Sequence, residues 1–357
     1  MEIMSAKEAS KRWRISQRRV AVLCAEQRIP GAQMVGNMWV LPVDTGKPED
    51  ARSARKTSDS KVKPIIKWAG GKGQLLGEIR KRYPDGLGTS IRKYAEPFVG
   101  GGAVLLDILG TIHGLDQVFI SDVNAELVNM YRNVQLRVED VISLLENYSN
   151  SFMPLDTEAR RAYYYNKRKR FNELKQKKQL DLELAALFIF LNKTCFNGLY
   201  RVNSKGENNV PMGSYKTPPI CDADNLRLVS AAIANIEIVC GDYRASQEFI
   251  DSNTFAYFDP PYRPLTQTAS FTSYTEDCFN DDDQRQLATY VHKLAEMGAR
   301  VLVSNSDPRN VNPNDNFFDD LYAPLTIERV RATRMINSNG SGRGEISELL
   351  IHTPKLQ

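Results

Sequence analysis

The octapeptide FAYFDPPY, residues 255–262, is the most informative part of this 357-residue chain. Its first four residues are apolar and predict a short strand that ends just before Asp259. Pro260 and Pro261 have no N–H groups, so the chain turns here instead of continuing as a paired strand. Ligands of open α/β sheets bind beyond the carboxyl ends of the strands, which is where Asp259 and Tyr262 are expected.

The side chains of this turn suit a nucleobase with an exocyclic amine. The nitrogen of such an amine is a poor nucleophile because its lone pair is delocalised into the ring. Two acceptors, the Asp259 carboxylate and the Pro260 carbonyl, would take its two N–H bonds and favour a pyramidal nitrogen in the transition state. Tyr262 offers a flat ring on which a base can stack, worth about 1–3 kcal/mol. The alternative is a proline-stiffened strand end with Tyr262 packed into the core.

A second candidate site lies earlier in the chain, at the three glycines of residues 100–102. They fall between an expected strand at 93–96 and an apolar helix at 103–109. Glycine lets the backbone turn sharply and approach a ligand closely. Asp122 follows the next expected strand, at 118–121, where open sheets place a carboxylate for ribose hydroxyls. These features fit any adenosine-containing cofactor, NAD included, and glycine turns also serve packing alone.

Further strands are expected on both sides of these motifs. Apolar or alternating runs predict them at residues 236–239, 300–303, 325–334 and 348–352. Between the two motifs the pattern is interrupted by a basic helix, an apolar helix at 182–191 and a polar stretch rich in Gly and Asn. The expected architecture is an α/β sheet domain in two halves, residues 64–150 and 230–357, separated by a mainly helical insert at 151–229.

The composition excludes several classes of protein. Hydrophobic residues make up 42% of the chain and charged residues 25%, which is ordinary for a soluble globular protein. The longest apolar run, residues 185–191, is too short to span a bilayer, and the N-terminus lacks the apolar segment of a signal peptide. The five cysteines lie far apart without a C-x-x-C pair, which argues against disulfides and a zinc site. We therefore expect a cytoplasmic protein without a metal ion.

The formal charge of +4 is unevenly distributed. Residues 1–63 have a net charge of +6 and residues 155–180 another +6, so the rest of the chain is acidic. Two separate basic segments indicate polyanion binding, although a basic run is also typical of a solvated helix face.

The first basic segment has a recognisable order of elements. Ser5 and Glu8 have the spacing of a capping box for a first helix, and a second helix is expected at 17–26. Two short strands, at 32–35 and 38–41, follow and are joined by Gly-Asn. This order resembles the small winged helix-turn-helix module of excisionase-type and MerR-type DNA-binding proteins, whose second helix enters the major groove.

In that module Arg18 and Arg19, at the start of the second helix, would face DNA. The sequence assigns the module to residues 1–42, and a flexible linker to residues 43–63, which contain almost no large apolar side chains. The alternative is a basic appendage that packs on the main domain.

Several motifs together resemble the Dam-type family of DNA adenine-N6 methyltransferases. They are, in the family's order, KWAGGK at 67–72, EPFVG at 96–100, Asp122 after a strand, NKTCFNGLYR at 192–201, GENNVPMGSY at 206–215 and DPPY at 259–262. FTSY at 271–274, Ser304-Asn305 and SNG at 338–340 also match the family. The resemblance covers residues 64–354, and the first 63 residues lie outside it.

This resemblance implies a Rossmann-like methyltransferase sheet that binds S-adenosylmethionine. The cofactor residues would be Trp68, Lys72, Phe98, Gly100, Gly102, Asp122 and Asp259. Asp259, Pro260 and Tyr262 would be catalytic, with the first two accepting from the target amine and Tyr262 stacking on the adenine. Because the target atom lies inside the duplex, the base would first have to flip out.

The resemblance also implies a DNA partner and a recognition segment. Arg201 would contact a guanine, Phe196 and Leu199 would wedge into the base stack, and Pro211 would contact a base. The partner would be double-stranded DNA, bound by a monomer, with GATC as the recognition sequence. Neither a membrane nor a metal ion is implied.

Other classes of function compete with the adenine-N6 methyltransferase interpretation. A cytosine-C5 methyltransferase needs a Pro-Cys nucleophile, and no cysteine here follows a proline. Cytosine-N4 transfer uses similar amine chemistry, so only the family resemblance excludes it. An NAD-dependent oxidoreductase leaves the turn at Asp259 unexplained. The alternative that stays open is a DNA-binding regulatory protein with a vestigial methyltransferase body.

Overall fold

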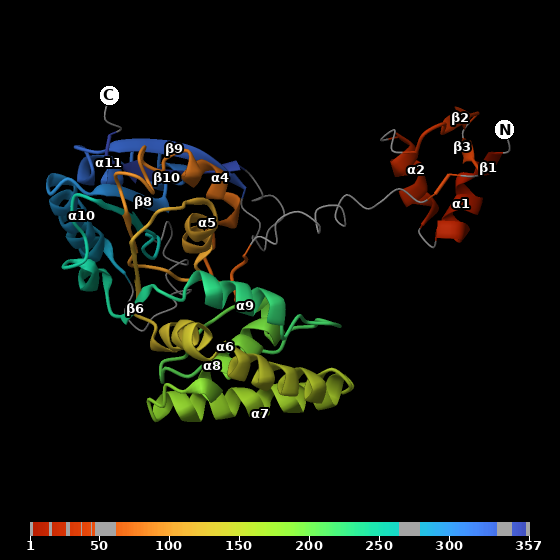
Figure 1. Cartoon of the computed structure of the whole chain (residues 1–357), viewed down its shortest axis with the longest axis horizontal. Helices are drawn as coiled ribbons and strands as arrows, with labels where there is room; N and C mark the ends of the chain where they lie inside the picture. The colour runs from red at the N-terminus through yellow and green to blue at the C-terminus, as the bar shows by residue number, and fades with distance from the viewer. Residues whose placement is uncertain are drawn as a thin grey trace. The chain divides into compact units, whose positions relative to one another are not determined.

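Figure 1 shows the chain as a computed structural model, which describes residues 3–13, 16–25, 29–36, 38–43, 45–46, 62–263, 279–333 and 345–354. The chain divides into two compact units, Met1–Lys61 and Val62–Gln357. None of the helices in these ranges combines the length and the apolar character that crossing a bilayer requires.

The N-terminal unit is a small three-stranded sheet with two helices. Its elements are β1 (Ile3–Ser5), α1 (Ala6–Trp13), α2 (Gln17–Ala25), β2 (Gln33–Val35) and β3 (Met38–Pro42). The sheet is antiparallel, in the order β1-β3-β2. Trp13 of α1, Val20 and Leu23 of α2 and Leu41 of β3 share its core. The two helices and the hairpin confirm the expected order, whereas β1 was not predicted.

The expected capping box at the start of α1 is present. The Ser5 N–H donates to Glu8 Oε2 over 2.8 Å, and the Glu8 N–H donates to Ser5 Oγ over 3.3 Å. Arg18 and Arg19 lie in the first turn of α2, but their side chains are outside the described part of the structure. Most of the expected linker, at residues 47–61, also lies outside it.

The second unit is built on a seven-stranded sheet. Its strands are β4 (Lys93–Glu96), β5 (Gln117–Asp122), β6 (Glu237–Cys240), β7 (Thr254–Phe258), β8 (Arg300–Ser306), β9 (Thr326–Thr333) and β10 (Glu345–His352). Their order is β6-β5-β4-β7-β8-β10-β9. The first five are parallel, and β10 is antiparallel to both of its neighbours. All seven strands confirm those expected from the sequence, with small differences at their ends.

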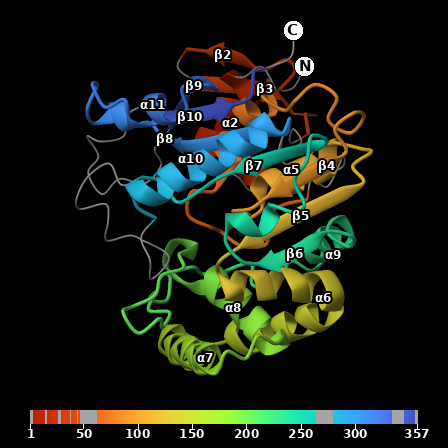
Figure 2. The ribbon, with the colours of Figure 1, turned by 90° about the vertical axis from the view of Figure 1, so that its left-hand side faces the viewer.

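Helices cover both faces of this sheet. Successive side chains of a strand point to opposite faces, so Phe255 and Tyr257 of β7 belong to one buried cluster and Phe258 to another. The first cluster includes residues of α4 (Leu76–Arg80) and α5 (Ala103–Thr111), and the second includes residues of α10 (Asp281–Glu296) and α11 (Phe317–Leu321). Figure 2 shows α10 lying along its face of the sheet.

The strand order reverses between β4 and β7. From β4 the sheet continues through β5 to β6 on one side, while β7 and β8 lie on the other. In open α/β sheets such a switch point opens a crevice at the carboxyl ends of the strands. β4 ends at Glu96, shortly before the glycine turn, and β7 ends at Phe258, directly before Asp259. The fold therefore brings the two candidate motifs to the same crevice.

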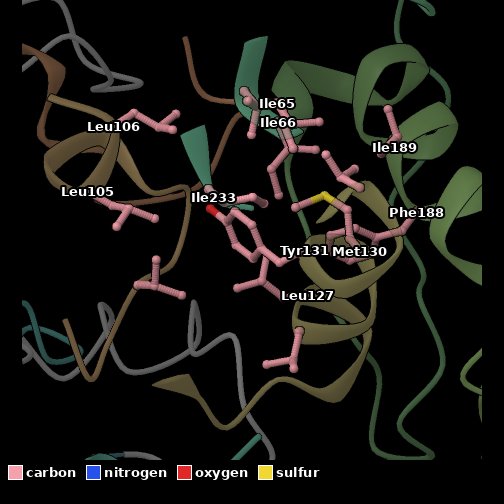
Figure 3. Packing of buried hydrophobic residues seen from close by; sticks show 14 of the residues in the cluster. Ile65, Ile66, Leu105, Leu106, Leu127, Met130, Tyr131, Phe188, Ile189 and Ile233 are labelled. Atoms are coloured by element: carbon pink, nitrogen blue, oxygen red, sulfur yellow. The ribbon is translucent and has the colours of Figure 1, made fainter. Parts of the chain in front are cut away.

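The insert is helical, as expected. It contains α7 (Thr157–Gln176), α8 (Leu182–Thr194) and most of α9 (Ala223–Ala232), and it directly follows the long helix α6 (Ala125–Phe152), which ends at its start. Every residue of α8 from Leu184 to Asn192 is buried. Figure 3 shows Met130 and Tyr131 of α6 packed in one cluster with Phe188 of α8. Because the same cluster contains residues of the sheet, the insert and the sheet fold as one unit.

Candidate active site

Lys72 and Asp259 meet at the carboxyl edge of the sheet. Lys72 opens the 3-10 helix η1 (Lys72–Gln74), and its Nζ atom lies 2.7 Å from Asp259 Oδ1. The same ammonium donates to the Gly70 carbonyl over 2.7 Å. The Lys72 side chain is 5% exposed and that of Asp259 20%, so the carboxylate is shielded but still reachable from solvent. The structure thus joins two motifs that the sequence assigned to one site.

A second group holds the same oxygen of Asp259. Ser304 of β8 donates its hydroxyl to Asp259 Oδ1 over 2.8 Å, and the Tyr257 hydroxyl lies 2.9 Å from Ser304 Oγ. Both Ser304 and Tyr257 are fully buried. Among the described residues, no hydrogen bond or ion pair reaches Asp259 Oδ2. The carboxylate is therefore fixed through one oxygen, which leaves the other to accept from a ligand.

Tyr262 is held by both its hydroxyl and its ring. The hydroxyl donates to Glu348 Oε2 of β10 over 2.6 Å, and the ring centroid lies 4.6 Å from Lys72 Nζ. Burial, with the nearby Asp259 and Glu348 carboxylates, raises the pKa of Tyr262 well above its usual value. The side chain is only half-buried, so Tyr262 is not the core residue of the alternative interpretation. Pro260, directly after Asp259, is buried.

The glycine turn packs tightly against two aromatic rings. Gly100 and Gly102 have φ angles of 48° and 70°, in the left-handed region that favours glycine. A Cβ atom on Gly100 would lie 2.8 Å from the Trp68 ring, and one on Gly102 would lie 2.6 Å from the Tyr131 hydroxyl. Trp68 also stacks on Tyr200, with ring centroids 5.6 Å apart. Close packing is therefore one reason why Gly100 and Gly102 have no side chain. Trp68 contacts both the glycine turn and Tyr200 of the insert.

Asp122 closes the turn at the end of β5. Its Oδ2 accepts from the Gly100 N–H over 3.1 Å, and its Oδ1 accepts from the Asn124 N–H over 2.9 Å. Burial raises the pKa of Asp122. Each carboxylate oxygen can accept a second hydrogen bond, so the group retains capacity for ribose hydroxyls. Asp122 is thus also a structural residue of the turn, a role that the sequence did not indicate.

Phe98 lines the other side of the turn. Its ring stacks on Tyr243 of the 3-10 helix η3 (Tyr243–Ser246), with centroids 5.8 Å apart. It also meets Phe279 edge to face, with centroids 6.0 Å apart. Phe98 therefore forms an aromatic wall between the end of β6 and the segment that leads into α10.

Sequence reasoning gave no role to a buried carboxyl group beside these residues. Glu96 ends β4, is 2% exposed, and accepts a 2.6 Å hydrogen bond from the Tyr94 hydroxyl. Burial raises the pKa of Glu96 to about 8, and the nearby Asp259 carboxylate acts in the same direction. A charged residue at the end of a buried parallel strand was the signal that could have identified it.

The residues expected to recognise DNA lie in one loop, residues 195–216, which we call the recognition loop. Phe196 opens η2 (Phe196–Gly198), is 52% exposed, and donates its N–H to the Pro211 carbonyl over 2.9 Å. Arg201 is exposed, and its Nε donates to Asn209 Oδ1 over 2.7 Å. Leu199, in contrast, is half-buried against the core cluster. The structure thus brings Phe196 and Pro211 into contact through their backbones, while the Leu199 side chain packs against the protein core.

Some expected features fall outside the described part of the chain. They include the motifs at 271–274 and 338–340. Within the described residues, no group of three or more His, Cys, Asp and Glu side chains is placed to hold a metal ion.

The chain is similar to a known protein family and to individual members of it. Residues 68–336 match the family described as D12 class N6 adenine-specific DNA methyltransferase. The type II methyltransferase M.MjaIII of Methanocaldococcus jannaschii is 48% identical over 293 residues, which cover 81% of this chain and 98% of that protein. The DNA adenine methylase of Haemophilus influenzae is 34% identical over 291 residues, which cover 81% and 93%.

A further relative extends the match beyond the sheet unit. The DNA N-6-adenine-methyltransferase of Escherichia phage P1 is 33% identical over 354 residues, covering 94% of this chain and 43% of that protein. This share is larger than the sheet unit alone, so the match continues into the N-terminal unit. From the family match and these relatives, the chain belongs to the D12 class of N6 adenine-specific DNA methyltransferases.

Proposed function

We propose that this enzyme transfers the methyl group of S-adenosylmethionine to N6 of an adenine in double-stranded DNA, within GATC, after the base has flipped out of the duplex. The observation that best supports this proposal is the contact of Lys72 with Asp259 at the switch point of the sheet. There the glycine turn and the Asp259 turn are neighbours, so a methyl donor on one and an amine on the other would lie close together.

The residues around the glycine turn fit the proposed cofactor. Asp122 has acceptor capacity for ribose hydroxyls, and Gly100 and Gly102 present backbone without a Cβ atom. Phe98, Trp68 and Lys72 border the same turn or the Asp259 carboxylate. When bound, S-adenosylmethionine supplies an electrophilic methyl group on a sulfonium.

The Asp259 turn supplies the acceptors that activate the amine. Lys72 and Ser304 fix Oδ1, so Oδ2 can accept one N–H of the adenine amine while the Pro260 carbonyl accepts the other. These bonds draw the nitrogen lone pair out of the ring and toward the methyl group as the transition state forms. Tyr262, fixed by Glu348, would stack on the base. The transfer would then be a direct displacement without a covalent enzyme intermediate: the N–C bond would form as the S–C bond breaks, S-adenosylhomocysteine would leave, and the nitrogen would lose one proton through its hydrogen-bond acceptors.

The recognition loop supplies candidate contacts to the duplex. Arg201 is the best candidate for a bidentate bond to guanine because its side chain is exposed and its guanidinium is oriented by Asn209. The exposed Phe196 ring, with Leu199, would wedge into the base stack, and Pro211, whose carbonyl accepts from the Phe196 N–H, would contact a base. The GATC assignment rests on the Dam-type resemblance of this segment. The enzyme would act on DNA as a monomer.

The N-terminal unit is proposed to bind DNA as a winged helix-turn-helix module, with Arg18 and Arg19 toward the groove. Its helix, helix and hairpin order and the net charge of +6 over residues 1–63 support this role. Deleting residues 1–61 should weaken DNA affinity and reduce its salt dependence, with the single-turnover methylation rate retained at saturating DNA. Unchanged affinity and salt dependence would reduce the unit to an appendage.

The decisive test of the function is Asp259→Ala. We expect this variant to lose methyl transfer while retaining DNA binding, because the side chain acts on the amine and not on the duplex. Products on plasmid DNA should be mapped at base resolution for N6-methyladenine, with Asp224→Ala as the control, since the Asp224 side chain is 99% exposed. Methylation that survives in Asp259→Ala would refute its role. A wild-type protein that binds DNA without methylating it would favour the regulatory alternative.

A further inference from the structure

One face of α7 is bonded at regular intervals to the recognition loop. The residues at positions 160, 164, 168, 172 and 176 are four apart, so they lie in one row along the helix. Arg160 donates to the Lys216 carbonyl over 2.9 Å, Tyr164 and Arg168 to the Val210 carbonyl over 2.8 and 2.9 Å, and Gln176 to Glu207 Oε1 over 2.9 Å. Figure 2 shows α7 and the green segment that follows α8 on the same side of the insert.

Asn172 makes the central contact of this row. Its Nδ2 donates to the Asn208 carbonyl over 3.1 Å, and its Oδ1 accepts from the Asn208 N–H over 2.9 Å. The amide thus bonds both backbone groups of one residue, as a neighbouring strand would. Asn208 itself is 6% exposed. A buried backbone segment of the loop is therefore satisfied by the side chain of a helix instead of by a sheet partner.

The loop has little regular structure of its own to fix its shape. Within residues 195–216 the structure shows the one-turn helix η2 and isolated bridges of Cys195 with Met212 and of Val202 with Asn208. Asn197 has a φ angle of 55°, in the left-handed region that non-glycine residues rarely adopt. Holding such a segment in one conformation costs about 1–2 kcal/mol of backbone entropy per residue. The bonds from α7 offset part of this cost.

The basic side chains of α7 also act inside the protein. Six of the nine basic residues in segment 155–180 contact other groups of this chain: Arg160, Arg161, Lys167, Arg168, Arg170 and Lys175. The Lys167 Nζ atom lies 4.1 Å from the centre of the Tyr148 ring, and the Lys175 Nζ atom lies 3.3 Å from Glu126 Oε1. Much of the charge that suggested polyanion binding therefore stabilises the insert.

We propose that α7 is the template that sets the shape of the recognition loop, and that Asn172 is a positioning residue for sequence discrimination. Asn172 fixes the backbone of Asn208, and the next residue, Asn209, orients the Arg201 guanidinium through its side chain. The Asn209 N–H also donates to the Arg201 carbonyl over 3.1 Å. A chain of direct bonds thus runs from α7 to the proposed guanine-reading side chain. This inference rests on the proposed function of Arg201.

The test compares Asn172→Ala with Lys169→Ala in the full-length chain. Asn172→Ala changes no charge, so it cannot act by removing a phosphate contact, whereas Lys169 is an exposed basic residue of the same helix. With Asn172→Ala, the preference for GATC over duplexes with one substituted base pair should fall about tenfold, and KM for DNA should rise, while kcat on GATC stays within about twofold. S-adenosylmethionine affinity should not change. Lys169→Ala should leave the preference intact.

A second variant and a second measurement distinguish a change in the recognition loop from a general loss of folding. Gln176→Ala removes an exposed contact at the tip of the loop, and a smaller loss of preference in the same direction is expected. Hydrogen exchange should show faster exchange of the Asn208 N–H in Asn172→Ala than in the wild type. A preference unchanged in both variants, with Asn208 protection retained, would overturn the proposal. If the wild type proves inactive on adenine, the proposed function fails, while the exchange measurement still tests the template.

Discussion

The Lys72 ammonium lies 2.7 Å from the Asp259 carboxylate, which connects the start of the sheet unit to the turn that follows β7. Both side chains are mainly buried, so the attraction between them is screened less than in a surface pair. The contact makes the orientation of Asp259 dependent on a residue far away in the sequence.

We predict that Lys72→Met lowers kcat for methyl transfer by about 100-fold, the scale of loss for one electrostatic contact in an active site. Removal of the ammonium leaves the buried Asp259 oxygen without its charged partner. Single-turnover methylation with saturating cofactor and DNA measures this loss. The control is Lys81→Met, which removes an exposed lysine paired with Glu78. Equal rates for both variants would contradict the proposed part of Lys72.

Ser304→Ala should lower kcat by about tenfold, because a hydrogen bond to a charged group contributes about 1.5–3 kcal/mol. Ser304 donates to Asp259 Oδ1, so without it the carboxylate is held by Lys72 alone. Tyr257→Phe, which removes the hydroxyl behind Ser304, should have a smaller effect. Cofactor affinity measured by calorimetry should stay unchanged. Thr289→Ala, an exposed hydroxyl deletion on α10, is the control, and a loss of kcat there would show that the assay reports general damage.

The strands and the two turns were predictable because their signals are local. The apolar run at 255–258 followed by Asp-Pro-Pro marks a strand end wherever it occurs, and three glycines before an apolar helix mark a turn. Strand order was not predictable in the same way. Ser304 reaches Asp259, and the Tyr257 hydroxyl reaches Ser304, only because β7 pairs with β8, and nothing in either strand alone specifies that neighbour. Sequence reasoning therefore found Asp259 and matched Ser304 to a family motif, but it did not show that Ser304 and Tyr257 orient the carboxylate.

The meaning of the charge at 155–180 also depended on tertiary structure. A basic helix with solvent around it and one packed into an insert have the same composition. In the fold, Arg170 pairs with Glu183 of α8 and Lys175 with Glu126 of α6. These partners come from different helices, so only the packing of the insert shows that the charges are used internally. The short strand β1 was missed for a related reason, since its three residues are recognisable only from their pairing with β3.

Two glycines near α5 form a matched pair for testing the turn. Gly102→Ala places a Cβ atom 2.6 Å from the Tyr131 hydroxyl at a φ angle of 70°, so we expect a loss of about 1–3 kcal/mol in unfolding free energy and weaker cofactor binding. Gly110→Ala, inside α5, meets no atom within 4 Å and should stabilise the protein by about 0.5–1 kcal/mol. Urea unfolding with and without S-adenosylmethionine measures both. A stable Gly102→Ala protein with normal cofactor affinity would show that the turn tolerates a side chain.

The buried Glu96 carboxyl should make stability depend on pH. Burial raises the pKa of Glu96 from its ordinary value of 4.5 to about 8, so between these values the folded protein holds a proton that the unfolded chain releases. Stability from this group is complete below about pH 4.5 and is lost as the pH rises toward about 8, by about 1.4 kcal/mol per pH unit at the steepest.

Glu96→Gln isolates this contribution. Glutamine keeps an acceptor for the Tyr94 hydroxyl but does not titrate, so its stability relative to the wild type should rise with pH through this window and level off above about pH 8. Urea midpoints measured from pH 5 to about pH 8.5 test the prediction. Glu237→Gln makes the same chemical change at an exposed position of β6 and serves as the control. If both variants kept a constant difference from the wild type at every pH, Glu96 would have to be ionised in the folded protein throughout. Its charge would then have to be balanced inside the site, and the Lys72 ammonium would be shared between two carboxylates instead of serving Asp259 alone.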